Sequence, residues 1–170
     1  TQKVAHGTTA TVNAMVQRHG AKTGLITTKG FKDHLIIMKA GRGVGVPDAE
    51  KVRFSRALKP DPLVPDALTE EVGERIDYAG RVLSPLDEVD ARRAIQCLLD
   101  KGVEAIAISL LWSFLNPEHE LYIRDLVREM APHITVSTGS ELVPVMGEYE
   151  RTTTTVINAY LGPILARYVH

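Results

Sequence analysis

The sequence predicts an α/β protein in which helices pack against a mixed or parallel sheet. Between residues 84 and 146, amphipathic segments alternate with short apolar ones at the spacing of a helix–strand–helix–strand unit. Residues 103–111 (VEAIAISLL) are almost continuously apolar, which is typical of a parallel strand covered on both faces. The segment is therefore predicted to form a parallel α/β unit with right-handed crossovers.

Residues 1–83 are predicted to combine a loop, a helix and strands with an irregular excursion. Residues 10–18 place apolar side chains on one side, as in a short helix that stops near Gly20. Residues 22–28 (KTGLITT) predict a buried strand. Seven Gly and Pro residues between positions 41 and 65 prevent long helices. We expect this excursion to be mobile and to contact a partner or another part of a longer parent protein.

Shorter elements complete the first part of the chain. Residues 31–38 predict a short helix followed by irregular backbone. Residues 71–77 and 81–83 flank a turn that contains Gly80, so they predict a β-hairpin.

The second part, residues 84–146, is the helix–strand–helix–strand unit, and residues 147–170 follow it as a final helix leading into a further domain. The first helix is expected to be opened by Pro85 and Asp87 and to end near 101, and a strand at 103–111 follows it. The second helix is expected to be capped by Asn116 and Pro117 and to end near 130, and a strand at 133–137 follows it. The last helix is expected to be disturbed by Pro163.

Charge and cysteine content narrow the classes of partner. Twenty Lys and Arg against 21 Asp and Glu give a net charge of -1, and no basic stripe stands out, so nucleic-acid binding is not expected. No apolar run approaches 18 residues, so no membrane span is expected. The single cysteine, Cys97, cannot form an internal disulfide, and a reducing cytoplasm is the simplest setting.

The glycine–threonine segment near the start is the first candidate binding site. His6, Gly7, Thr8 and Thr9 lie where a loop runs into a helix, and Asn13 follows one helical turn later. Such a turn offers backbone N–H groups and two hydroxyls to an anion or a carbonyl. The alternative is that Thr8 or Thr9 serves only as a helix N-cap.

The second candidate site lies at the start of the last helix. Glu148 and Arg151 are three residues apart and can pair on one helical face, and Thr152 opens a run of four threonines. Two interpretations remain open, a surface ion pair or a carboxylate and guanidinium that face a polar ligand. We expect the two candidate segments to form opposite walls of one site.

The histidines show no metal-binding pattern. His119 lies between Glu118 and Glu120, so the three side chains point to different sides of a helix, and no partner follows four residues later. No metal site is expected in this chain.

Ordered blocks along nearly the whole chain carry a family resemblance. They are residues 6–14 (HGTTATVNA), 24–33 (GLITTKGFKD), 62–65 (PLVP), 74–77 (ERID), 80–82 (GRV), 110–120 (LLWSFLNPEHE) and 148–161 (EYERTTTTVINAYL). Together they resemble the N-terminal region of the hydantoinase A/5-oxoprolinase family.

The resemblance implies a fragment of an actin-like ATPase fold of the sugar-kinase and Hsp70 kind. It implies that the full-length parent uses ATP and Mg²⁺ to phosphorylate the oxygen of a small cyclic amide or ketone. It also implies a second subunit of the hydantoinase B type. The family's first phosphate loop, an Asp followed by Gly-Gly-Thr, is not in this sequence, so no nucleotide is expected to bind the fragment alone and the fragment is expected to be inactive.

Three functions follow as alternatives. The first is an ATP-dependent hydrolase that opens a hydantoin, N-methylhydantoin or 5-oxoproline ring. The second is the ATP-using subunit of an acetone- or acetophenone-type carboxylase. Residues 37–43 (IMKAGRG) keep this function open because they lack the arginine–proline pattern of many hydantoinases. The third is a non-catalytic ligand-binding or assembly module.

Overall fold

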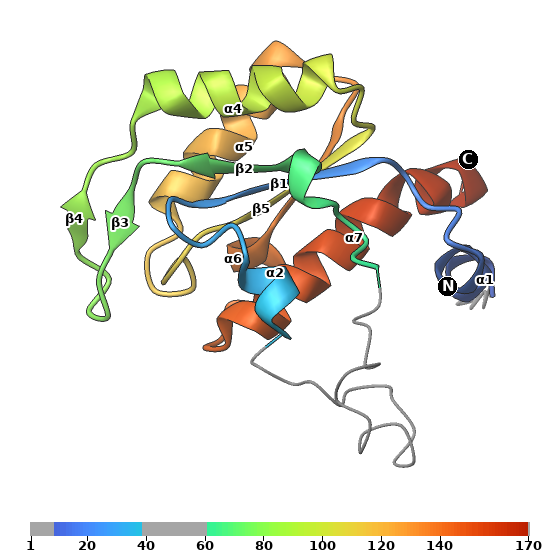
Figure 1. Cartoon of the computed structure of the whole chain (residues 1–170), viewed down its shortest axis with the longest axis horizontal. Helices are drawn as coiled ribbons and strands as arrows, with labels where there is room; N and C mark the ends of the chain where they lie inside the picture. Colours follow the sequence, from blue (N-terminus) through green and yellow to red (C-terminus); the bar gives the residue numbers. More distant parts are fainter. Residues whose placement is uncertain (1–8, 39–60, 170) are drawn as a thin grey trace, which may run out of the picture.

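A parallel sheet of four strands forms the centre of the fold (Figure 1). The structure is a computed structural model that describes residues 9–38 and 61–169. The strands lie in the order β2-β1-β5-β6, with bounds of Thr69–Val72 for β2, Thr23–Thr28 for β1, Ala105–Ser109 for β5 and Thr135–Thr138 for β6. Every neighbouring pair is parallel, so the predicted α/β class is confirmed.

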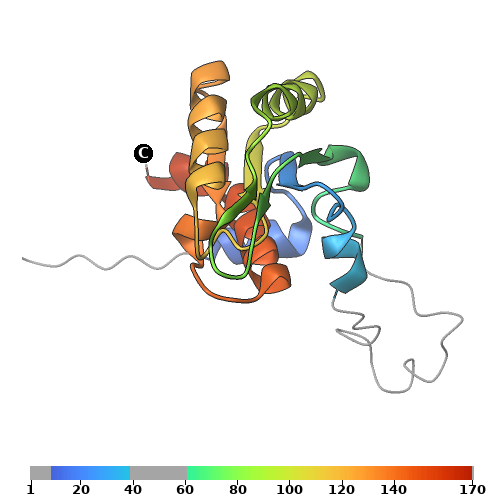
Figure 2. The same ribbon diagram turned by 90° about the vertical axis from the view of Figure 1, so that its left-hand side faces the viewer.

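Helices cover both faces of this sheet. Helices α4 (Glu88–Asp100) and α5 (Glu118–Met130) lie side by side on one face, and α7 (Glu148–Val169) crosses the other (Figures 1 and 2). Every residue of β1 and β5 is buried, which explains why β5 is almost continuously apolar.

The core lies between the sheet and the helices on either side. Gly24 in β1 allows α4 to approach closely, because a Cβ at this position would lie 2.8 Å from a methyl carbon of Leu98. Ile95, Ile106 and Ile108 are buried in the same apolar cluster. Helix α4 therefore rests on a closely packed layer.

Helix α1 (Ala10–Gln17) lies against the C-terminal half of α7, beside the amino end of β1 (Figure 1). The main-chain N–H of Ala21 donates to the oxygen of Tyr160 at 2.9 Å. Gly20 packs on the Tyr160 ring so closely that no Cβ could fit there. The short helix predicted at 10–18 is confirmed.

The expected excursion at 41–65 is described only from residue 61 onward. Residues 41–60 lie outside the described residues. Their expected mobility and contacts therefore stay predictions. The short helix predicted within 31–38 is present as α2 (His34–Ile37), and a 3₁₀ turn, η2 (Asp66–Leu68), leads into β2.

The predicted hairpin is present, but its first strand is divided. Residues 71–77 do not form one strand, because β2 ends at Val72 and β3 (Arg75–Ile76) pairs separately with β4 (Val82–Ser84). Gly73 causes the break, since its N–H donates to the Asp90 carboxylate at 2.9 Å and its oxygen accepts from the Asp87 N–H at 2.9 Å. These bonds tie the break between β2 and β3 to the start of α4.

Other boundaries shift for local reasons. Helix α4 begins at Glu88, and Asp87 caps it as predicted by accepting from the Asp90 N–H, whereas Pro85 lies before the helix because β4 extends to Ser84. Asn116 and Pro117 precede α5 as predicted. Pro117 occupies the N-cap position, and the side-chain oxygen of Asn116 accepts from the Glu118 N–H at 3.1 Å. The turn of helix α6 (Gly139–Leu142) was not predicted, and α7 continues through Pro163.

The predicted segments share one sheet. Residues 1–83 supply β1 and β2, residues 84–146 supply β5 and β6, and the final helix packs on the face they form. Among the helices of residues 9–38 and 61–169, none has both the length and the apolar content needed to span a bilayer.

Candidate functional site at the carboxyl edge of the sheet

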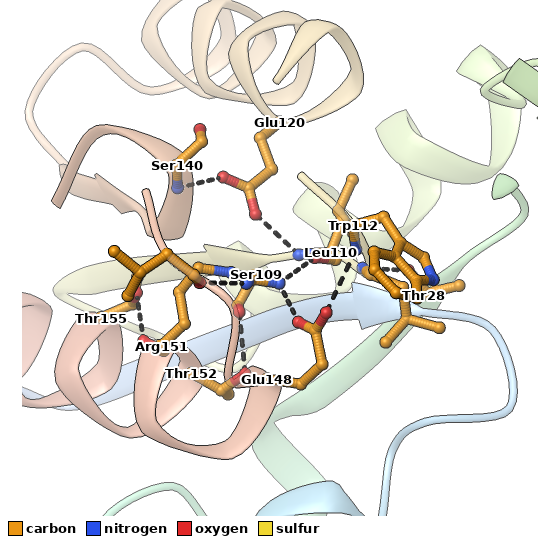
Figure 3. A network of polar contacts seen from close by, with 12 residues as sticks. Thr28, Ser109, Leu110, Trp112, Glu120, Ser140, Glu148, Arg151, Thr152 and Thr155 are labelled. Atoms are coloured by element: carbon orange, nitrogen blue, oxygen red, sulfur yellow. Dashed lines mark hydrogen bonds and ion pairs between the residues drawn. The ribbon is translucent and has the colours of Figure 1, made fainter. Parts of the chain in front are cut away.

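The strand order creates a switch point between β1 and β5. The chain leaves β1 toward β2 on one side, whereas β5 lies on the other side and continues toward β6. In open α/β sheets, ligands bind where the connections at the carboxyl ends diverge in this way. Thr28 ends β1 and Ser109 ends β5, so the residues around them form the candidate site (Figure 3).

Three successive backbone N–H groups follow β5 at this edge. Each donates to a side-chain oxygen, from Leu110 to Glu120 at 2.7 Å, from Leu111 to Thr28 at 3.0 Å and from Trp112 to Glu148 at 3.3 Å. Trp112 has a left-handed backbone with a φ of 57°. Backbone N–H groups in such turns form anion-binding concavities. Here the protein's own oxygens satisfy these three N–H groups, so the three groups do not form a free amide cradle for a phosphate.

Glu120 joins two loops at the edge from inside the fold. Its side chain is 0 % exposed, and its second carboxylate oxygen accepts from the Ser140 N–H at 2.8 Å. The carboxylate therefore ties the end of β5 to the start of α6. Burial raises the pKa of Glu120, and the N–H donors of Leu110 and Ser140 oppose that rise.

Arg151 fills the space between α7 and the same loop. Its side chain is 0 % exposed, and its guanidinium donates to the oxygens of Leu110 at 2.9 Å and Val145 at 3.2 Å. The guanidinium also pairs with Glu148 and stacks 5.3 Å from the centre of the Phe114 ring. Burial lowers the pKa of Arg151, and the nearby Glu120 opposes that effect.

The predicted pairing of Glu148 with Arg151 is confirmed, but the surface interpretation is wrong. Arg151 is fully buried because residues 148, 151 and 155 lie on the face of α7 that meets the sheet. Thr152 is buried as well, and its hydroxyl lies 2.8 Å from the hydroxyl of Ser109 (Figure 3). Each of the three residues has a protein partner, although Nε of Arg151 makes no hydrogen bond within the described residues. A role in ligand binding remains a prediction for all three residues.

The glycine–threonine segment lies only partly within the described residues. His6, Gly7 and Thr8 are outside them. Thr9 occupies the N-cap position of α1, but its exposed side chain makes no capping hydrogen bond there, and Asn13 is also exposed.

The described residues do not bring the two expected walls together. Helix α1 lies at the amino end of β1 and contacts α7 near Tyr160, whereas Arg151 bonds to Leu110 beyond the carboxyl end of β5. Along α7 alone, the rise from Arg151 to Tyr160 is about 14 Å. Thr9 and Asn13 therefore lie at the other edge of the sheet from Arg151, while the site expected for the whole glycine–threonine segment stays a prediction because His6, Gly7 and Thr8 lie outside the described residues.

A buried chain of polar side chains was missed by the sequence analysis. The Thr28 hydroxyl accepts from Leu111 N–H and donates to one Glu74 oxygen, and the other Glu74 oxygen lies 2.9 Å from Nδ1 of His119. Both Glu74 and His119 are buried. The sequence did contain one signal, since Glu74 alternates with the buried residues Val72 and Ile76 and so shares their inward face.

His119 therefore has a partner 45 residues away, although its sequence neighbours cannot serve it. Within residues 9–38 and 61–169, no cluster of three or more His, Cys, Asp or Glu side chains is arranged to hold a metal ion.

The fold and this edge together define a parallel α/β module whose loops are fixed by buried carboxylates. The family described as the hydantoinase/oxoprolinase N-terminal region matches residues 1–131, and the chain belongs to this family. The predicted resemblance is thus confirmed.

Two relatives illustrate the sequence similarity. The acetophenone carboxylase gamma subunit of Aromatoleum aromaticum is 41% identical over 167 residues, which cover 93% of this chain and 22% of the relative. The caprolactamase subunit alpha of Pseudomonas jessenii is 39% identical over 165 residues, which cover 96% of this chain and 23% of the relative. The chain thus spans less than a quarter of the length of these proteins.

Two solved structures share the fold. Nucleotide-free acetone carboxylase superimposes with a TM-score of 0.82 at 35% identity, over 91% of this chain and 22% of that one. The ATP-dependent caprolactamase of Pseudomonas jessenii superimposes with a TM-score of 0.81 at 37% identity, over 96% of this chain and 23% of that one. Both share the actin-like fold, so the expected assignment is confirmed.

Proposed function

We propose that the protein containing this chain is an ATP-dependent hydrolase that opens a cyclic amide of the hydantoin, N-methylhydantoin or 5-oxoproline type. The observation that carries the proposal is the likeness to an ATP-dependent caprolactamase, which extends over 96% of the chain in sequence and in backbone. A lactam oxygen is a poor leaving group, and phosphorylation by ATP turns it into a good one. We propose Mg²⁺ as the metal that accompanies the nucleotide.

The described residues supply the scaffold for this chemistry. The carboxyl edge of the sheet is held by Glu120, Arg151 and Thr28 from three different elements. Because most of their polar atoms are used within the protein, with Nε of Arg151 as an exception, we assign nucleotide contacts to the segment that holds His6, Gly7, Thr8 and Thr9 and to other parts of the parent protein.

A second candidate is the ATP-using subunit of a ketone carboxylase. It is favoured by the 41% identity to the acetophenone carboxylase gamma subunit and by the fold shared with acetone carboxylase. The two candidates differ in the group that attacks the activated carbon, which is water in the hydrolase and a carboxylating partner in the second case.

We propose that the protein works with a second subunit of the hydantoinase B type. Several relatives are named as subunits, including the acetophenone carboxylase gamma subunit and the caprolactamase subunit alpha, which supports a multi-subunit assembly. We also propose a cytoplasmic location, which the free thiol of Cys97 supports.

The test is an ADP-release assay on the complete protein with its partner subunit. Hydantoin, N-methylhydantoin, 5-oxoproline, ε-caprolactam, acetone and acetophenone are each supplied with ATP and Mg²⁺, with and without bicarbonate. Lactam-dependent ADP release without bicarbonate supports the hydrolase. Release that requires both a ketone and bicarbonate supports the carboxylase, and no substrate-dependent release contradicts both. Repeating the active assay with EDTA tests the need for a divalent cation.

Thr9 provides a direct test of the glycine–threonine segment. Its side chain makes no capping bond in the structure, so Thr9→Ala should leave helix α1 intact. If its hydroxyl binds a phosphate oxygen, the variant should bind ATP about tenfold more weakly or worse. Thr11→Val, two residues further along the same helix, is the matched control, and an equal effect of both variants would contradict the assignment.

A further inference from the structure

A cavity of about 310 Å³ lies between α2 and α7, outside the network at the carboxyl edge. Among the described residues, its wall includes Leu35 and Ile36 of α2, Leu63, and Tyr149, Thr153 and Val156 of α7. Most of this wall is apolar. Its volume lies at the lower end of the range of small-molecule pockets, which is about 300–1,000 Å³.

Helix α7 separates this cavity from the buried arginine. Tyr149, Thr153 and Val156 lie four and three residues apart, so they form one stripe along the helix. Arg151 and Thr155 lie on the adjacent stripe and are buried toward the sheet. The same two turns of helix thus present polar groups to the loops and a mostly apolar surface to α2.

One polar atom in this wall has no partner. The hydroxyl oxygen of Thr153 is buried and makes no hydrogen bond within the described part of the chain. A buried hydroxyl without a partner is unfavourable, and native structures rarely keep one unless a ligand or water completes it. An apolar cavity with a single unsatisfied hydroxyl matches a compact apolar molecule that carries one hydrogen-bonding oxygen.

The charges around the cavity favour a neutral occupant. The acidic group among the described lining residues is Asp61, whose side chain is 93% exposed and lies 4.0 Å from its ion-pair partner Arg18. None of the described lining residues is a Lys or Arg that could pair with a carboxylate. A ligand that carries a carboxylate would therefore lose its hydration without gaining a cationic partner.

We propose that this cavity binds a small, uncharged cyclic amide or ketone, and that the Thr153 hydroxyl donates to its carbonyl oxygen. The inference rests on the proposed function and narrows its substrate class. It favours neutral lactams and disfavours 5-oxoproline, which carries a carboxylate.

The test is a titration of the complete protein, labelled with ¹³C in Ile, Leu and Val methyl groups, with ε-caprolactam and with 5-oxoproline. Saturable shifts are expected for the methyls of Leu35, Ile36, Leu63 and Val156 with ε-caprolactam and not with 5-oxoproline. Thr153→Val keeps the shape but removes the donor, so ε-caprolactam should bind about three- to tenfold more weakly. Thr154→Val, its exposed neighbour, is the control and should bind as the parent does.

Several outcomes would overturn the inference. They are the absence of shifts at these methyls, equal affinity of Thr153→Val and the parent protein, or tighter binding of 5-oxoproline than of ε-caprolactam. Nuclear Overhauser contacts from residues 39–60 to the cavity methyls in the free protein would also overturn it, because the cavity would then be filled by the chain itself.

A second variant and a separate assay keep the outcomes distinct. Ile36→Trp places a large side chain at the mouth of the cavity and should abolish the shifts while the rest of the spectrum is retained. ADP release by the complete assembly is measured in parallel. Lactam-dependent release without methyl shifts overturns the cavity and leaves the proposed function, whereas shifts without any release support the cavity and contradict the proposed function.

Discussion

The guanidinium of Arg151 donates a hydrogen bond of 2.9 Å to the main-chain oxygen of Leu110, 41 residues earlier in the sequence. This bond joins the first turns of α7 to the loop that follows β5. Because Glu120 accepts from the N–H of the same Leu110, both polar main-chain atoms of one residue are held by buried side chains. The position of this loop therefore depends on two ionisable groups inside the fold.

Replacing Arg151 by Met should destabilise the protein by about 3–5 kcal/mol, because it removes the partner of the buried Leu110 oxygen, the Val145 oxygen and Glu148. Urea unfolding followed by circular dichroism measures the loss. Arg128→Met is the control, since Arg128 is exposed and its nearest carboxylate lies 3.6 Å away, and it should cost no more than about 0.5 kcal/mol. Equal losses in the two variants would contradict the structural role of Arg151.

Glu120 should make stability fall as the pH rises. Its pKa is raised above the ordinary value of 4.5 by burial, so the folded state binds the proton more tightly than the unfolded state. The stabilisation is fully present below pH 4.5 and is lost as the pH rises through the folded pKa. Urea unfolding across this range, compared between the parent protein and Glu120→Gln, measures the effect.

Glu120→Gln should be the less stable protein at low pH, since an amide replaces one of the two oxygens that accept N–H groups. Its deficit should shrink as the pH rises, because only the parent has a carboxyl to ionise. Glu129→Gln, at an exposed position of the same helix, should follow the parent's profile. A deficit that grows with pH would show that the pKa of Glu120 is lowered.

Thr28→Val should expose the role of the buried Thr28–Glu74 contact. The variant removes the acceptor of the Leu111 N–H and a donor to the Glu74 carboxylate, so we expect a loss of about 2 kcal/mol. Amide hydrogen exchange should also become faster at Leu111 than in the parent. Thr154→Val should change neither quantity, and unchanged exchange at Leu111 in Thr28→Val would argue against this hydrogen bond.

Asp87 should act as the N-cap of α4. Its side chain accepts from the Asp90 N–H at 3.0 Å, and Asp87→Ala should cost about 1 kcal/mol in urea unfolding. Asp87→Asn keeps an oxygen acceptor and should lose only a few tenths of that amount. If Asn were no better than Ala at this position, the cap would contribute nothing to stability.

The sequence by itself determined the class of the fold and much of its order. The spacing of apolar residues and the residues at helix ends, such as Asn116, predicted α1, β1, α5 and the parallel unit. They could do so because these signals act within a few residues of each other. The spacing of Glu148 and Arg151 likewise fixed their pairing, since a helix brings residues three apart onto one face. The sequence blocks that resemble the hydantoinase/oxoprolinase family also predicted the family to which the chain belongs.

Only the tertiary structure decided where these faces point. Arg151 is buried and not on the surface because β5 and its loop come to lie over α7, and no local pattern encodes that meeting. Glu74 finds His119 across 45 residues for the same reason. Thr9 and Asn13 lie at the opposite edge of the sheet from Arg151 because strand direction and strand order set their separation. Local spacing fixes which side chains share a face, whereas long-range packing fixes what that face meets.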